Sequence, residues 1–196
     1  MANSTVEICN RALDLIGADA ITSLSDNSKA ARLCNRNFNP VRDAVLRSYP
    51  WNCAIRRAQL PALVAAPSFG YGRAFQLPQG PVPEYCLRVL DINGEPEFDI
   101  DYRVEGRNIV TDEAAPLEIV YIARIEDPTQ FDPLLDDVIA ARLAADIAFS
   151  LVANATLVGE LRDTYAQKMT EARMIDAREG SGRSYTVADQ WLQSRL

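Results

Sequence analysis

An α+β fold is predicted for this 196-residue chain: N- and C-terminal helix pairs form a four-helix bundle, with a small antiparallel β-subdomain inserted between them. Apolar residues recur at helical spacing near both ends of the chain, whereas the middle holds short alternating runs and most of the 11 prolines. Either helix pair alone would leave an apolar stripe in water, so we expect the pairs to pack together. The predicted segments are 1–53 for the first half of the bundle, 54–125 for the β-subdomain, 126–180 for the second half and 181–196 for a C-terminal tail.

The N-terminal pair is defined by its caps. Ser4 and Glu7 form a capping box, and the helix that follows ends near Gly17. A second amphipathic helix begins near Asn27 or Ser28 and ends at Tyr49-Pro50, where Trp51 caps it. Pro40 lies inside this helix and removes one backbone donor, so we expect a kink there or two shorter helices.

The β-subdomain is predicted from three segments. Residues 86–92 and 117–122 are strand candidates, and residues 98–104 alternate, with Phe98, Ile100, Tyr102 and Val104 on the face expected to be buried. Residues 105–108 form a hairpin turn, so one small antiparallel sheet is expected.

The C-terminal pair also has clear boundaries. Asp132 suits the N-cap position and Pro133 the first helical position. The alanines of this third helix permit close helix packing, and a last long helix runs from Asn154 or Thr156 to near Gly180.

The composition argues against an enzyme. Without histidine the chain lacks the commonest general base and metal ligand, and it has neither a phosphate-binding loop nor a dinucleotide motif, so no cofactor is expected. Its four cysteines form no CxxC pair, and we expect no disulfide. No signal peptide or membrane span is expected, which places the protein in a cytoplasm or in a particle assembled there.

Two acidic groups are candidate sites. Carboxylates at 95, 97, 99 and 101 could hold calcium or magnesium, although a solvated strand face is favoured. Carboxylates at 126, 127, 132, 136 and 137 could supply a catalytic pair, as in a hydrolase using Asp132 and Asp136. Acids near a helix N-terminus are more simply explained by the helix dipole.

Arginines and the tail are the candidate contact surfaces. Six arginines could bind nucleic acid: Arg32, Arg36, Arg42, Arg47, Arg56 and Arg57. The net charge of −7 favours a protein interface instead. Trp191, with Tyr185, Leu192 and Leu196, either folds back on the chain or docks on a partner.

Several short blocks, in order along residues 5–180, carry a resemblance. They are Leu33-Cys34-Asn35, Val41-Arg42-Asp43-x-Val45-Leu46-Arg47, Tyr49-Pro50-Trp51-Asn52, Phe75-x-Leu77-Pro78, Cys86-Leu87-Arg88-Val89, Tyr121-Ile122-Ala123, Asp132-Pro133, Leu143-Ala144-Ala145-Asp146-Ile147-Ala148, and Ala172-Arg173 with Asp176-Ala177. In these blocks the chain resembles the tail tubular protein A family, the head-to-tail adaptors of short-tailed bacteriophages. Pro40 departs from the pattern, and residues from 181 on are not covered.

The resemblance implies a virion protein without catalytic activity. Such adaptors form a ring, usually of twelve copies, that joins the portal protein to the tail nozzle and leaves a channel for DNA. We therefore expect DNA to pass through without specific binding, repelled by acidic residues. Arg32, Arg36, Arg42 and Arg47 are expected to meet a neighbour's acidic third or fourth helix, and Tyr185, Trp191, Leu192 and Leu196 to dock on the portal. The alternative is a tail-completion or assembly factor that acts as a monomer or dimer.

Overall fold

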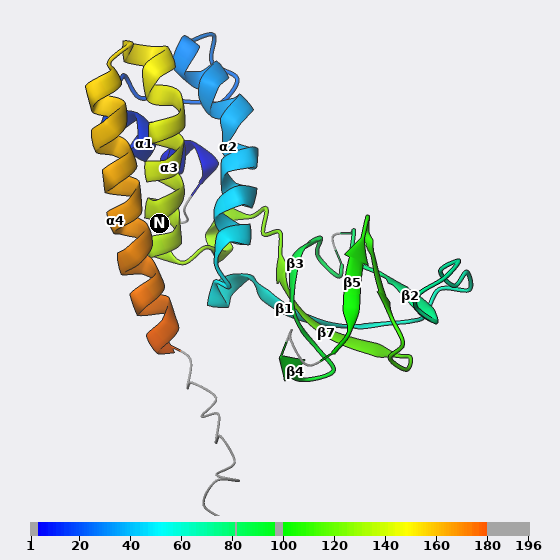
Figure 1. Ribbon diagram of the computed structural model, residues 1–196. Coiled ribbons are helices and arrows are strands. Elements are labelled where there is room, and N and C mark those ends of the chain that lie inside the picture. The colour runs from blue at the N-terminus through cyan, green and yellow to red at the C-terminus, as the bar shows by residue number, and fades with distance from the viewer. Residues whose placement is uncertain (1–3, 81, 97–99, 180–196) are drawn as a thin grey trace, which may run out of the picture.

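The structure, a computed structural model, describes residues 4–80, 82–96 and 100–179. It is a mixed α+β fold with four helices and two small antiparallel sheets (Figure 1). The helices are α1 (Thr5–Ile16), α2 (Lys29–Ser48), α3 (Pro133–Val152) and α4 (Ala155–Glu179), with short 3-10 turns at Asn52–Ala54 and Pro128–Gln130. The strands are β1 (Ile55–Leu60), β2 (Arg73–Gln76), β3 (Cys86–Ile92), β4 (Glu95–Pro96), β5 (Tyr102–Glu105), β6 (Asn108–Thr111) and β7 (Leu117–Ala123).

Local capping starts and stops the helices where the sequence predicts. The Ser4 hydroxyl accepts a hydrogen bond from the Glu7 amide at 3.1 Å, and Gly17 ends α1 with a φ of 76°. Ser28 caps α2, and Asp132 caps α3 by accepting from the Leu134 amide at 2.8 Å. The Asn154 side chain accepts a hydrogen bond from the Thr156 amide at 3.0 Å. Of the two predicted start residues, Asn154 is therefore the one that caps α4.

Pro40 does not divide α2, so the expectation of two shorter helices is wrong. The helix is continuous from Lys29 to Ser48 although proline removes one backbone hydrogen bond. Phe38 and Val41 flank the proline and are both buried in the helical core, and this packing holds the two halves of α2 in one helix.

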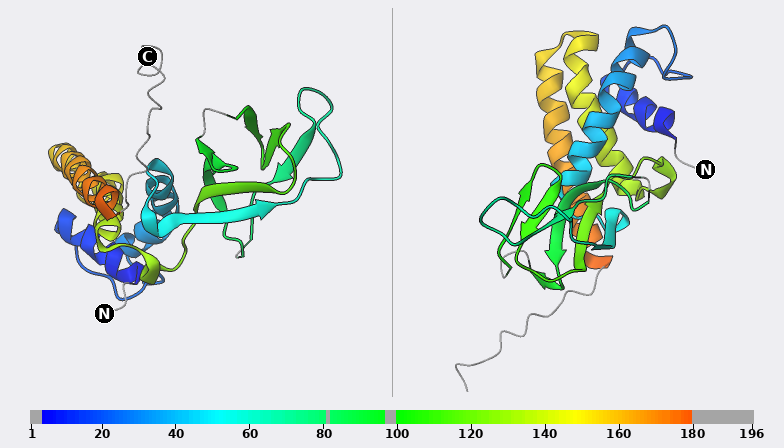
Figure 2. Two further views of the ribbon diagram at one scale, coloured as in Figure 1. Left: turned by 90° about the horizontal axis from the view of Figure 1, so that it is seen from below. Right: turned by 90° about the vertical axis from the view of Figure 1, so that its right-hand side faces the viewer.

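Helix α3 lies among the other three helices and contacts each of them. Figures 1 and 2 show α4 on one side of it and α1 and α2 on the other. Burial extends around most of α3, and Ala140, Ala141, Ala144, Ala145 and Ala148 are all buried. Small side chains let neighbouring backbones approach, so these alanines set the close spacing of the helices.

The strands form two sheets rather than the single sheet that the sequence predicts. One has the order β1-β7-β3-β4 and the other β2-β6-β5, all antiparallel. Four strands were predicted correctly in place: β3, β7, and β5 with β6, whose hairpin turn includes Gly106 at a φ of 60°. Sequence reasoning missed β1 and β2. Residues of both sheets, among them Leu60, Phe75 and Ile119, build a second core.

Two strand expectations need correction or fall outside the structure. Val104 is 50% exposed, whereas Ile100 and Tyr102 of the same alternating pattern are half-buried against the second core, so burial of that face does not extend to Val104. Phe98 lies outside the described residues.

The two cores meet along β7. Ile122 belongs to the helical core, whereas its neighbours Tyr121 and Ala123 belong to the core between the sheets. Successive strand residues point to opposite faces, so the end of β7, residues 121–123, is buried on both faces. Figure 1 shows the helices and strands as two parts that meet near the end of α2.

Trp51 fastens the end of α2. It is 1% exposed, its indole Nε1 donates to the Val45 carbonyl at 3.1 Å, and its ring meets Tyr49 edge-on with centroids 5.0 Å apart. The same carbonyl also accepts from the Ser48 hydroxyl at 2.7 Å, so Trp51 adds a second donor to a carbonyl in the last turn of α2, consistent with the predicted Trp51 cap.

We predict that Trp51→Ala lowers the free energy of unfolding by about 3–5 kcal/mol, since it leaves a cavity in the helical core. Trp51→Phe keeps most of the apolar volume and loses the donor, and should be about 1–2 kcal/mol less stable than the wild type. Urea unfolding followed by far-ultraviolet circular dichroism measures both, and an unchanged midpoint for Trp51→Ala would contradict the assignment.

Candidate functional site

The four α2 arginines that were predicted as interface residues differ in their surroundings. Arg32 is exposed and donates to Asn27 Oδ1 at 2.8 Å, and Arg36 is exposed with no ion pair to any described residue. Arg47 is also exposed, and its guanidinium donates to the Leu87 carbonyl of β3.

Arg42 requires a correction, because it is only 5% exposed and does not face solvent. Its Nε and Nη2 donate to Asp43 Oδ1 at 2.9 Å and 2.8 Å. A guanidinium whose charge is compensated within the chain is not free to bind a neighbouring subunit. Helical periodicity placed Arg42 outside the apolar stripe, whereas in the folded chain it is buried beside Asp43.

Asp43 connects helix and strand by a second ion pair. Its Oδ2 lies 2.9 Å from Nε of Arg124, the first residue after β7. Two arginines, one from the helix and one from the end of the strand, therefore share a single carboxylate. Because this carboxylate is only about a quarter exposed, the attraction is screened less than at an open surface.

Tyr85 extends this contact into the sheets. The guanidinium carbons of Arg107 and Arg124 lie 4.1 Å and 4.2 Å from the Tyr85 ring centre, which is within cation–π distance. Arg107 also donates to the Cys86 and Pro78 carbonyls at 3.0 Å and 2.8 Å. We call Arg42, Asp43, Tyr85, Arg107 and Arg124 the joint cluster.

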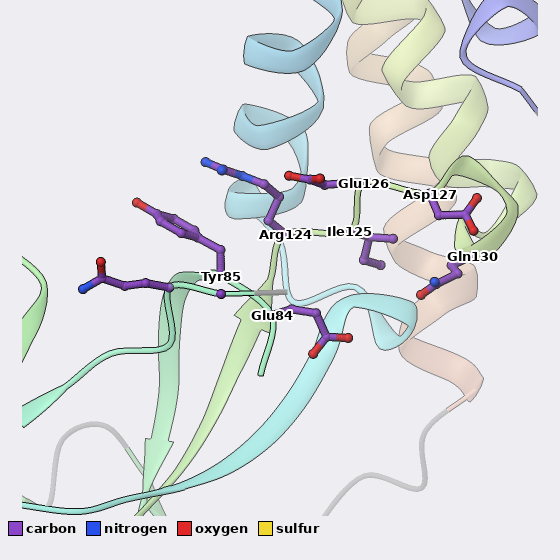
Figure 3. Close-up of a pocket in the computed structure, with 9 residues that line it drawn as sticks. Glu84, Tyr85, Arg124, Ile125, Glu126, Asp127 and Gln130 are labelled. Carbon is purple, nitrogen blue, oxygen red and sulfur yellow. The ribbon is translucent and has the colours of Figure 1, made fainter. Parts of the chain in front are cut away.

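A hollow of about 440 Å³ lies beside the joint cluster (Figure 3). Its wall includes Glu84, Tyr85, Arg124, Glu126, Asp127 and Gln130. Figure 3 shows Tyr85 and Arg124 side by side and Asp127 and Gln130 at the opposite end. Arg56 reaches the same region and lies 3.3 Å from Glu84. The wall offers carboxylates, one guanidinium, one phenol and side-chain amides, groups suited to binding a polar partner.

A second set of contacts fastens the end of α4 to the start of β1. The Asn52 amide donates to Asp176 Oδ1 at 3.1 Å and its side chain to the Asp176 carbonyl at 2.7 Å. Arg173 lies over the Tyr49 ring at 5.3 Å. Burial raises the pKa of Asp176, although the Asn52 amide partly opposes that shift.

The acidic candidates can be located in part. Among the described residues no group of three or more cysteine, aspartate or glutamate side chains could hold a metal. Asp101 accepts from the Tyr71 hydroxyl at 2.9 Å, whereas residues 97 and 99 lie outside the described part. Asp132 caps α3, and Asp137 pairs with Arg11 at 3.2 Å and Lys168 at 3.3 Å.

The structure also bears on the predictions for the cysteines, for a membrane span and for the C-terminal tail. Cys9, Cys34, Cys53 and Cys86 are all free thiols. Over the described ranges no helix is both long enough and apolar enough to cross a membrane. The tail residues Tyr185, Trp191, Leu192 and Leu196 lie outside the described residues.

Comparison with known proteins adds no family assignment, since no family model matches the sequence and no curated protein is similar to it.

We predict that Asp43→Asn lowers the free energy of unfolding by about 1–3 kcal/mol, because two arginines then lose their shared charge. The matched control is Asp146→Asn, which breaks the more exposed Arg142–Asp146 pair of α3 and should change stability by about 0.5 kcal/mol or less. Chemical denaturation of both variants at low and high salt measures their free energies of unfolding. An equal loss in the two variants would show that the Asp43 ion pairs contribute no more than an exposed surface pair.

Asp136 gives a pH prediction. It is fully buried, and burial raises its pKa from an ordinary value of 3.8 to about 6, opposed by Arg11. The folded state therefore holds this proton more tightly than the unfolded state, and the stability that the proton contributes is lost as pH rises through about 6. Asp136→Asn should match the wild type near pH 4 and be more stable by about 1–3 kcal/mol at pH 8. Thermal unfolding across this range measures the difference, and parallel pH curves for the two proteins would contradict it.

Proposed function

We propose that the protein is a structural head-to-tail adaptor of a short-tailed phage particle, with no catalytic role. Twelve copies would form a ring between the portal protein and the tail nozzle, with DNA passing through the channel unbound. In this proposal the four helices act as one bundle and form the body of the ring.

The observation that carries the proposal is how the blocks of the resemblance meet in space. Arg47 of the second block donates to the Leu87 carbonyl of the block on β3. Asn52 binds Asp176 of the last block across 124 residues of sequence. Blocks that are far apart along the chain therefore contact one another and join α2, β3 and α4. This supports the resemblance as one of fold and not of short segments alone.

The chemistry of the described surface agrees with a structural role. Several arginines are bound to carboxylates or backbone carbonyls of the same chain, as in the joint cluster, where Asp43 pairs with Arg42 and Arg124. Contacts of this kind hold the helices and strands at a fixed angle, which an adaptor requires if it is to join two different rings. An assembly factor that acts as a monomer or dimer remains the alternative, and mass measurement with and without portal separates the two.

Arg36 and Arg32 are the exposed α2 arginines that we propose face a neighbouring copy. The double variant Arg32→Glu/Arg36→Glu should block ring formation on the portal and leave the thermal midpoint of the monomer unchanged, because neither side chain is buried. Arg103→Glu, an exposed arginine on β5, is the matched control and should assemble normally. Negative-stain microscopy and light scattering with portal report the outcome, and normal rings from the double variant would exclude this surface.

A further inference from the structure

The loop between β1 and β2 is uncharged along its whole length. Residues 61–72 read P-A-L-V-A-A-P-S-F-G-Y-G, and we call this segment the β1–β2 loop. Its two large apolar side chains near the tip, Val64 and Phe69, are 107% and 90% exposed. An apolar pair in full contact with water, without a charge nearby in sequence, is typical of a surface that another protein covers.

The β1–β2 loop is fastened at both ends. The Leu63 amide donates to the Ala74 carbonyl at 2.8 Å, and the Gly72 amide donates to Asp112 Oδ1 at 2.7 Å. The Tyr71 hydroxyl donates to Asp101 Oδ1 at 2.9 Å. A loop that is already held at its base loses less conformational entropy on binding, which favours a role as a docking element.

A shallow groove on the outer face of α4 is the matching surface. Its volume is about 640 Å³, and Ala166, Thr170, Met174 and Ile175 line it, with Glu171 and Arg178 at its edges. Met174 is 54% exposed and Ile175 40% exposed. We call this surface the α4 groove. Apolar side chains dominate both surfaces, so docking would bury apolar area, while Glu171 and Arg178 in the groove wall would have to keep water or find polar partners.

The β1–β2 loop and the α4 groove lie at opposite ends of the molecule. Figure 1 shows α4 at the far left and the loop at the far right, and the view from below in Figure 2 shows the same separation. A loop that projects away from its own groove fits a second copy instead. Two different complementary surfaces at opposite ends generate head-to-tail contacts, which close into a ring when the rotation between copies permits.

We propose that the β1–β2 loop of one copy inserts Val64 and Phe69 into the α4 groove of the next copy. This inference rests on the proposed ring and adds the contact through which neighbours bind. It is a different surface from the α2 arginines, and the two can be tested separately.

The test uses two full-length variants. The loop variant is Val64→Ser/Phe69→Ser, and the groove variant is Met174→Gln/Ile175→Gln, which keeps good helix formers on α4. Sedimentation velocity over a concentration series should show self-association of the wild type weakened about tenfold or more in each variant. Ser68→Ala in the same loop and Glu160→Gln on α4 outside the groove are matched controls and should associate like the wild type.

Mixing the variants provides the sharpest readout. Each mixed pair retains one intact loop and one intact groove, so an equimolar mixture should form heterodimers and stop there, at twice the 21.7 kDa chain mass. Wild-type association in both variants would overturn the inference while leaving the ring proposal intact. Failure of the mixture to form dimers would also overturn it. A wild type that stays monomeric at millimolar concentration, while the loop variant loses portal binding, would show that the loop docks on another protein.

Discussion

The close packing of α3 against the other three helices is the constraint on which the rest of the structure depends. Its buried alanines leave room for the backbones of α1, α2 and α4, so each of those helices needs only one apolar face. A larger side chain at Ala141 or Ala144 would have no space to occupy and would force the neighbouring helices apart. The position of α2 and α4 in turn fixes the ends to which the strands are attached.

Strand β7 carries that constraint into the sheets, because it pairs with β1 and β3 and its last three residues are buried on both faces. The joint cluster acts at the same place, where Asp43 compensates one arginine from α2 and another from the end of β7. Hydrophobic burial and a shared carboxylate therefore work together at one junction. Burial supplies most of the free energy, whereas the directional contacts of the guanidinium groups restrict the angle between helices and strands.

In the proposed ring, some contacts fix the shape of each copy and others bind neighbouring copies. The joint cluster holds each copy in one shape, while the exposed α2 arginines, the β1–β2 loop and the α4 groove remain on the outside. A ring needs contacts strong enough to close but copies that stay soluble before assembly. A small apolar loop tip within an acidic chain of net charge −7 satisfies both requirements, because repulsion between copies limits premature association.

The sequence by itself determined the elements whose signals lie within a few residues. Ser4, Asp132 and Asn154 bond to amides two or three positions away, and the apolar spacing of α1 and α3 is a local pattern, so these boundaries could be predicted. Strand β1 could not, since its residues 55–60 lack alternation and become a strand only by pairing with β7 more than 50 residues later. Arg36 and Arg42 belong to one helix, yet one is exposed and the other buried. Tertiary structure alone decided that difference, because Arg124, which shares the Asp43 carboxylate with Arg42, reaches α2 only after the chain has folded.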